Sequence, residues 1–327
     1  MKVLLYSEGM KFIAQSGVGR AIKHQMKALE LNNIDYTTDP NDDFDVIHIN
    51  TTGPKSIYLA KKAKKMGKKV IMHAHSTEED FRDSFFFANT VAPLFKKEIV
   101  YAYSQADELV TPTPYAKQVI DSYNIGLDCT PVSNGIDLNK FIYSSSKAKL
   151  FRDEYGFETT DKIILSVGLQ IKRKGILDFI KLAKRMPDYH FVWCGYTSPW
   201  LMTSDVKKAI NHCPNNVHML GYVTNMVGAY SACHTFLMAT KEETEGIVVL
   251  EALSMKRPVI IRDIPVYDSW LEDGLHCYKA SDLDSFQKVI EGVVENTLHD
   301  TTEAGYIVAT DRSLSTIGEQ LEVIYNR

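Results

Sequence analysis

The chain has 327 residues, enough for about two domains at roughly 150 residues each. It carries 37 Lys and Arg against 41 Asp and Glu, a net charge of −4, which argues against a general nucleic-acid binder because such proteins are basic. Hydrophobic residues make up 45% of the chain and no apolar run approaches the roughly 20 residues of a membrane span, so the composition is that of an ordinary globular protein.

Short β-branched runs alternate with amphipathic stretches through the first part of the chain. Buried strands are predicted at 3–6, 45–49, 70–73 and 108–111, and helices at 18–31 and in the Lys-rich stretch that ends near residue 66. This alternation predicts a mostly parallel sheet covered by helices on both faces.

The pattern restarts after residues 144–149, SSSKAK, which we expect to be a surface connection because they are small and charged. Further strands are predicted at 163–167, 191–194, 217–220, 236–238 and 259–261, with helices at about 175–186, 224–232, 246–254 and 282–296. We therefore expect two doubly wound α/β domains, 1–137 and 138–311, with a closing helix in 312–327 that packs back on the first domain.

The string ETEGIVVLE, residues 243–251, stands where a loop is predicted to pass into a helix near Gly246. A helix N-terminus offers free N–H groups and a positive dipole end to a diphosphate. Glu243 then lies in the loop and Glu251 in the second helical turn. On spacing alone, acidic capping by Glu243 and Glu245 is the favoured interpretation. Binding of a sugar by one carboxylate and a ribose by the other is the alternative.

Three other strand ends carry polar or glycine residues. Gly17 and Gly19, in SGVGR, allow a phosphate or sugar to approach the backbone, and a tight turn is an equal interpretation. Residues 172–174, KRK, are either a solvated cluster or neutralise a leaving diphosphate. His73 and His75 end a strand, but no third ligand at useful spacing supports a metal site, and a histidine bonded to backbone is the alternative.

Other metal signals are weak. The D-x-D strings at 43–45 and 282–284 are predicted to be caps or solvated turns. The five cysteines are scattered without a CxxC pair, so neither a disulfide framework nor a zinc site is expected, and a reducing cytoplasm is the natural compartment. We expect no metal and no cofactor.

A basic and aromatic stretch lies in the first half of the chain. Residues 55–69 hold seven lysines and no acid, and the later segment 81–97 carries Phe85, Phe86, Lys96 and Lys97. Aromatic side chains beside lysines suit docking on anionic lipid, whereas an ordinary buried helix pair is the alternative. We predict that this stretch contacts a membrane surface.

Together these strings resemble the retaining GT-B glycosyltransferases of family four. Glu243 and Glu251 match the E-x7-E motif of that family. The similarity extends over nearly the whole chain, because four further strings match in order and spacing: SGVGR at 16–20, SNGID at 133–137, VGLQIKRKG at 167–175 and HMLGYV at 218–223.

The resemblance implies a UDP-sugar substrate and two Rossmann-like domains that face each other across a cleft. It also implies that Glu243 holds donor-sugar hydroxyls, that His75 orients the sugar, and that Lys174 and Arg173 stabilise the diphosphate. Leu169 stands where the family has an Arg after the strand-end glycine, so Arg173 is assigned that role from further along the loop. The implied donor-binding residues are Gly17, Gly19, Gly168, Tyr222, Val223, Gly246, Ile247, Val248 and Glu251, the last at the ribose.

HSTEEDFR at 75–82 and ETEGIVVLE are similar to strings of bacterial glycosyldiacylglycerol synthases. That similarity implies transfer of galactose or glucose to a glycolipid such as monohexosyl diacylglycerol, at the inner face of the cell membrane. Phe85, Phe86, Lys96 and Lys97 then serve the membrane and acceptor side. The alternatives are an acceptor that is diacylglycerol itself or a soluble sugar, a sugar-nucleotide epimerase, and a non-catalytic sugar-nucleotide-binding subunit.

Overall fold

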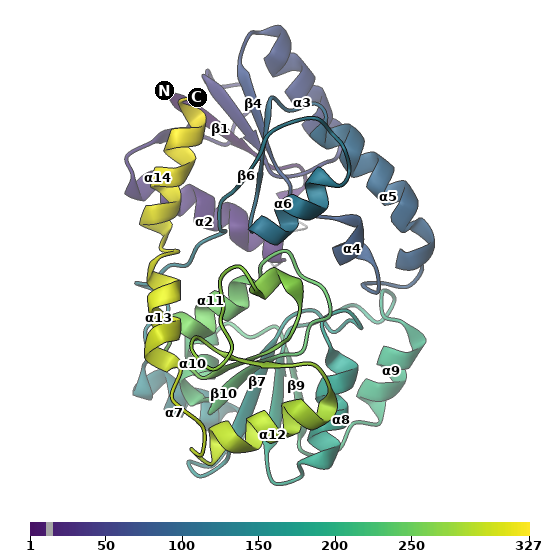
Figure 1. Ribbon diagram of the computed structural model, residues 1–327, viewed down its shortest axis with the longest axis vertical. Helices are drawn as coiled ribbons and strands as arrows, with labels where there is room; N and C mark the ends of the chain where they lie inside the picture. Colours follow the sequence, from purple (N-terminus) through teal and green to yellow (C-terminus); the bar gives the residue numbers. More distant parts are fainter. Residues whose placement is uncertain (11–15) are drawn as a thin grey trace. The chain divides into compact units, whose positions relative to one another are not determined.

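Residues 1–10 and 16–327 are described by the computed structural model, and they form two units (Figure 1). Unit 1 comprises Met1–Phe81, Thr90–Asp137 and Asp311–Arg327. Unit 2 comprises Arg82–Asn89 and Leu138–Thr310. The short segment Arg82–Asn89 therefore belongs to the second unit although it lies in the first half of the sequence.

Unit 1 is built on a parallel sheet with the strand order β2-β1-β3-β4-β5-β6. Its strands are β1 (Lys2–Tyr6), β2 (Asp35–Thr37), β3 (Val46–Ile49), β4 (Lys69–His73), β5 (Glu108–Thr111) and β6 (Cys129–Pro131). Its helices are α2 (Gly17–Leu31), α3 (Pro54–Lys65), α4 (Glu78–Phe81), α5 (Ala88–Tyr103, which begins in the Arg82–Asn89 segment), α6 (Pro114–Asp121) and α14 (Leu314–Tyr325). Alternate strand residues enter two separate hydrophobic clusters, so the sheet is covered on both faces.

The last helix of the chain completes unit 1. Helix α14 lies beside α2 (Figure 1), where the Asn32 side-chain amide donates to the Ser315 carbonyl at 3.0 Å. Leu314, Ile317 and Leu321 are buried in the same cluster as Val3 of the first strand.

Unit 2 repeats the architecture with the strand order β12-β11-β10-β7-β8-β9, again parallel throughout. Its strands are β7 (Ile163–Val167), β8 (His190–Cys194), β9 (Val217–Gly221), β10 (Thr235–Met238), β11 (Val259–Arg262) and β12 (Tyr278–Ala280). Its α-helices are α7 (Ser145–Tyr155), α8 (Ile176–Arg185), α9 (Ser204–Asn211), α10 (Met226–Ala232), α11 (Ile247–Ser254), α12 (Leu283–Val294) and α13 (Thr302–Thr310).

The predicted α/β class and the two parallel sheets are confirmed. The surface connection predicted at 144–149 is wrong, because helix α7 begins there. The Ser144 hydroxyl accepts the Lys147 N–H at the N-cap, Ala148 and Phe151 are buried at helical spacing, and Gly156 ends the helix in the left-handed conformation. Within the described residues, no helix combines the length and apolar character needed to cross a membrane.

Candidate active site

The carboxyl edge of the unit 2 sheet brings two of the predicted site residues together. Lys174 lies in the loop after β7 and Glu243 in the loop after β10, and the Lys174 ammonium is hydrogen-bonded to a carboxylate oxygen of Glu243. Glu243 is buried. The carboxylate therefore pairs with a cation instead of capping α11, whose N-cap, Gly246, has no side-chain hydrogen bond.

Gly175 explains how the two loops come so close. Its φ is +81°, in the left-handed region, and a Cβ there would lie 2.1 Å from the Ala239 carbonyl oxygen at the end of β10. Only a residue without a side chain allows this approach. Gly175 thus fixes the position of the neighbouring Lys174 against the loop that carries Glu243.

Charge governs the ionisation of this pair. Burial alone would raise the pKa of Glu243, but the nearby Lys174 and Arg173 cations and the hydrogen bond from Lys174 lower it below its ordinary value. Glu243 is therefore an ionised acceptor at neutral pH, which suits hydrogen bonds from sugar hydroxyls.

Arg173 has a different environment from the one its predicted role suggests. Its guanidinium donates to the Ser84 hydroxyl at 3.0 Å and to the Glu242 carbonyl at 2.8 Å, and lies 3.9 Å from Glu243. Its backbone N–H donates to the Asp83 carbonyl at 3.0 Å. Arg173 thus attaches the Arg82–Asn89 segment to the Glu243 loop, a contact that sequence reasoning missed. Its contribution at a diphosphate stays a prediction.

Helix α11 begins at Ile247, as predicted, with Gly246 at the N-cap in the left-handed conformation (φ +92°). Its N-terminus adjoins the Glu243 loop, so its free N–H groups lie on the same edge of the sheet. Glu251, in the second turn, is fully buried and accepts a hydrogen bond from the Tyr230 hydroxyl at 2.8 Å. That hydroxyl also lies 3.2 Å from the Val248 carbonyl oxygen.

The other predicted donor-binding residues of unit 2 lie at the same edge. Gly168 follows β7, and a Cβ there would lie 3.7 Å from the Lys174 side chain. Tyr222, exposed, and Val223, buried, follow β9.

In unit 1, Gly17 and Gly19 form the first turn of α2, whose N-cap Ser16 accepts the Gly19 N–H at 3.2 Å. His75, just beyond β4, is buried and hydrogen-bonded through Nε2 to the Asn50 side-chain oxygen at 2.8 Å. This side-chain partner replaces the backbone partner that the alternative interpretation expected.

His75 belongs to a column of three buried imidazoles that sequence reasoning did not find. The rings of His73 and His75 stack with centroids 3.9 Å apart, and His48 of β3 stacks on His73 at 5.4 Å. Burial is the main cause that lowers the pKa of His48 and of His75 to about 3, and burial together with its two neighbours lowers that of His73. All three rings are therefore neutral at pH 7.

The predicted membrane residues are divided between the units. In unit 2, Phe86 is 56% exposed and Phe85 is half-buried. The Phe86 N–H donates to the Leu201 carbonyl at 3.0 Å, and the neighbouring Trp200 is 87% exposed. Phe86, Phe87, Trp200 and Leu201 form what we call the aromatic patch. Sequence reasoning missed Trp200, although its Pro-Trp-Leu context in a loop after a strand is a usable signal.

In unit 1, Lys96 pairs with Glu78 at 3.5 Å and lies over the Tyr123 ring at 4.3 Å. Its ammonium is therefore engaged within the unit. Lys97 is exposed.

The D-x-D strings have structural roles. Asp282 caps α12 by accepting the Ser285 N–H at 2.8 Å, and Asp45 accepts the Lys2 N–H at 2.8 Å. Across residues 1–10 and 16–327, no three His, Cys, Asp or Glu side chains gather as a metal site would require.

Comparison with known proteins agrees with the fold of both units. The model of "Glycosyl transferases group 1" matches residues 147–307, and that of "Glycosyltransferase Family 4" matches residues 25–140. The sucrose-phosphate synthase of Thermosynechococcus elongatus has a similar structure, with a TM-score of 0.79, 14% identity, and coverage of 100% of this chain and 98% of that one. Anabaena Alr3699/HepE, solved with UDP and glucose, has a TM-score of 0.74, 17% identity, and coverage of 100% and 99%. The fold is that of a GT-B glycosyltransferase.

The chain is 42% identical over 330 residues to the processive diacylglycerol alpha-glucosyltransferase of Acholeplasma laidlawii, covering 99% of this chain and 98% of that protein. It is 26% identical over 235 residues to the alpha-galactosylglucosyldiacylglycerol synthase of Streptococcus pneumoniae, covering 70% of this chain and 63% of that protein. The chain belongs to glycosyltransferase family four.

Proposed function

We propose that the enzyme transfers a hexose, with retention of anomeric configuration, from a UDP-sugar to a glycolipid such as monohexosyl diacylglycerol. The full-length relative, whose name specifies diacylglycerol and an alpha-glucosyl group, supports the acceptor class and favours glucose over galactose. The Lys174–Glu243 pair beside the α11 N-terminus is the observation that carries the donor half of the proposal. It also argues against a non-catalytic binding subunit.

In the transfer, negative charge develops on the leaving diphosphate, so catalysis needs positioned positive charge and dipoles more than a strong base. Lys174 and the N–H groups at the start of α11 supply both in our proposal. Glu243, ionised and fixed by Lys174, accepts hydrogen bonds from donor-sugar hydroxyls. We keep the prediction that Glu251 binds the ribose of the donor and that His75 makes a further contact with the donor sugar.

We further propose that no divalent metal takes part. Lys174 and the helix terminus provide the charge compensation that a metal ion provides in other nucleotide-sugar enzymes. Both D-x-D strings are engaged elsewhere, as described for Asp45 and Asp282.

The aromatic patch is our proposed contact with the membrane that holds the acceptor. Trp favours the interface between headgroups and acyl chains, because its ring is apolar and its N–H can stay hydrated, and the Phe rings beside it add apolar area that inserts among the acyl chains. Lys97 and the exposed lysines of α3 are proposed to add attraction to anionic lipid at the inner face of the membrane.

The function is tested by incubating the protein with UDP-glucose or UDP-galactose, and with diacylglycerol or monoglucosyl diacylglycerol in mixed micelles. We expect dihexosyl lipid from UDP-glucose, with an alpha linkage by NMR, at an unchanged rate in EDTA. Product without a lipid acceptor would indicate an epimerase or a soluble acceptor. Loss of turnover in EDTA with recovery in Mn²⁺ would refute the metal-free proposal.

Membrane contact is tested by vesicle sedimentation. Trp200→Ser should weaken partitioning to anionic vesicles about tenfold or more. Full insertion of a Trp of roughly 200 Å² contributes up to about 5 kcal/mol at about 25 cal/mol/Å², and a third of that already exceeds the roughly 1.4 kcal/mol of a tenfold change. Phe86→Ser should act in the same direction. Leu150→Ser is the control, since Leu150 is 62% exposed on α7 of the same unit but outside the patch. Equal sedimentation of all variants would remove the patch from the proposal.

A further inference from the structure

Unit 2 contains a cavity of about 540 Å³ at the end of its sheet opposite to the Lys174–Glu243 pair. His234 immediately precedes β10 and Pro258 precedes β11, so this cavity lies at the amino ends of the strands. The Lys174–Glu243 pair lies at their carboxyl ends. Each of these two strands has four residues and so separates its ends by about 13 Å, which keeps the two sites apart.

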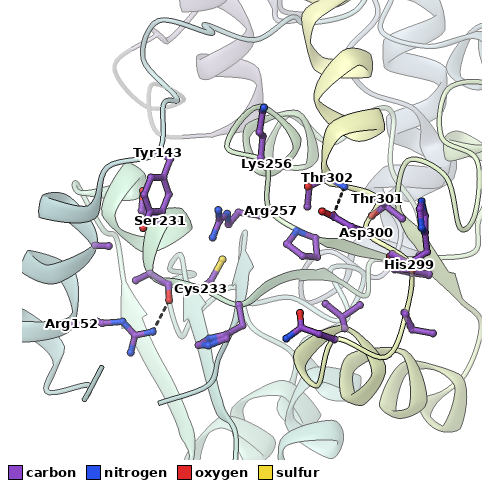
Figure 2. A pocket seen from close by; sticks show the side chains of 18 of the residues that line it. Tyr143, Arg152, Ser231, Cys233, Lys256, Arg257, His299, Asp300, Thr301 and Thr302 are labelled. Atoms are coloured by element: carbon purple, nitrogen blue, oxygen red, sulfur yellow. Dashed lines mark hydrogen bonds between the residues drawn. The ribbon is translucent and has the colours of Figure 1, made fainter. Parts of the chain in front are cut away.

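The cavity is lined by an excess of positive charge. Arg152, Lys256 and Arg257 line it, and Asp300 is the carboxylate among the lining residues. The Lys256 ammonium forms an ion pair at 2.7 Å with Glu303, a residue that does not line the cavity. Figure 2 shows the Arg257 side chain between the Tyr143 and Cys233 side and the Asp300 and Thr301 side of the cavity.

Neither guanidinium forms an ion pair with a carboxylate in the part of the chain that the structure describes. Arg257 donates through Nε to the Met255 carbonyl at 3.1 Å and lies over the Tyr143 ring at 5.2 Å. Arg152 donates to the carbonyls of Glu158, Asp161 and Ala232. Across residues 1–10 and 16–327, neither has an Asp or Glu oxygen within ion-pair distance, and the terminal nitrogens of Arg257 have no hydrogen-bond acceptor. Such partly buried cations call for an anionic ligand.

A second observation points the same way. Thr301 lines the cavity, is 2% exposed, and its hydroxyl has no hydrogen-bond partner within the part of the chain that the structure describes. A buried hydroxyl without a partner is uncommon in folded proteins and is satisfied when a ligand supplies one. Asp300 does not compete for the cations, because its carboxylate accepts the Thr302 N–H at 2.9 Å at the start of α13.

We propose that this cavity is a second ligand site, specific for a phosphate ester. Arg257 supplies two terminal N–H groups in the planar geometry that matches phosphate oxygens, Arg152 adds long-range charge, and Thr301 donates one hydroxyl. The volume falls in the range of about 300–1,000 Å³ typical of small-molecule sites, so it accommodates an organic group beside the phosphate. The proposal does not depend on the proposed transfer reaction.

The test is isothermal titration of the full-length protein with inorganic phosphate and with glycerol 3-phosphate at fixed ionic strength. We expect binding that Arg257→Gln weakens about tenfold or more, since a charge-assisted hydrogen bond is lost. Thr301→Val, which keeps the side-chain shape, should weaken binding to a smaller extent. Arg185→Gln is the matched control, because Arg185 is an exposed cation of the same unit that pairs with Asp284.

Phosphate bound at the other edge of the sheet is distinguished by Lys174→Met, which should leave this binding unchanged. Competition by phosphatidylglycerol vesicles, but not phosphatidylcholine vesicles, would identify a lipid headgroup as the source of the ester and support the site. Absence of competition would support a soluble ester. No binding by the parent protein, or binding that Arg257→Gln leaves intact while its thermal midpoint is unchanged, would overturn the proposal.

Discussion

Glu243→Ala should lower kcat about 10²–10³-fold, because one charge-assisted contact to the transition state contributes roughly 2.7–4 kcal/mol. Lys174→Ala should lower it to a similar extent. Each substitution also disturbs the partner: without Glu243 the ammonium of Lys174 loses the acceptor that fixes it, and without Lys174 burial raises the pKa of Glu243. The measurement is the initial rate of hexose transfer at saturating donor and acceptor.

A variant with both substitutions shows whether Glu243 and Lys174 act in catalysis as one pair or independently. If the pair acts as a unit, Glu243→Ala combined with Lys174→Ala should be little worse than either alone. Lys241→Ala is the control, because Lys241 is exposed in the same loop and pairs with Asp178 at 3.7 Å. Near-parental kcat in correctly folded Glu243→Ala would remove this carboxylate from the reaction.

The sequence predicts the central strands well, but of the four strands at the sides of the two sheets it predicts one alone, β9, at 217–220. The strands 163–167 and 108–111 were predicted residue for residue, because buried β-branched runs are a strong signal. The edge strands β2, β6 and β12 were not predicted. Each has three residues and at most one buried side chain, so none produces a continuous apolar run.

The predicted connection at 144–149 differs from helix α7 for a related reason. The composition of SSSKAK favoured a loop, and the buried residues that make it a helix, Ala148 and Phe151, extend beyond the string. A Ser at the N-cap is itself a helix signal, and the Lys149–Asp153 pair at i,i+4 adds to it.

In the candidate site, the sequence predicts which residues lie in the loops but not which side chains contact each other. Lys174 and Glu243 were each placed in a strand-end loop, but their pairing depends on the close approach at Gly175 that sequence spacing does not encode. The contact between Arg173 and Ser84 joins residues 89 positions apart. Local patterns carry no information about such a contact.

A second large effect is expected on the folding stability of unit 1 at acidic pH. Lowering the pH from 7 to 5 should destabilise unit 1 by several kcal/mol through His48, His73 and His75. In the unfolded chain each titrates near pH 6.5, whereas in the fold His48 and His75 titrate at about 3 and His73 well below 6.5. Between these values the unfolded state binds more protons, so stability is fully present above pH 6.5 and is lost as the pH falls.

The three groups together give a slope of up to about 4 kcal/mol per pH unit near pH 5, since each contributes about 1.4 kcal/mol. That slope is large against a typical folding free energy of about 5–15 kcal/mol. All three tryptophans, Trp193, Trp200 and Trp270, lie in unit 2. Tryptophan fluorescence therefore follows unit 2, while far-UV circular dichroism follows both units.

Urea titrations at pH 7.5, 6 and 5 should show a circular-dichroism transition that moves to lower urea and separates from the fluorescence transition as the pH falls. His48→Gln should reduce the pH slope by about a third, because one of three titrating groups is removed. His212→Gln, at an exposed histidine of unit 2, should not change it. If the urea midpoint of the circular-dichroism transition is the same at pH 7.5 and pH 5, the stacked imidazoles are not the acid-sensitive element of this fold.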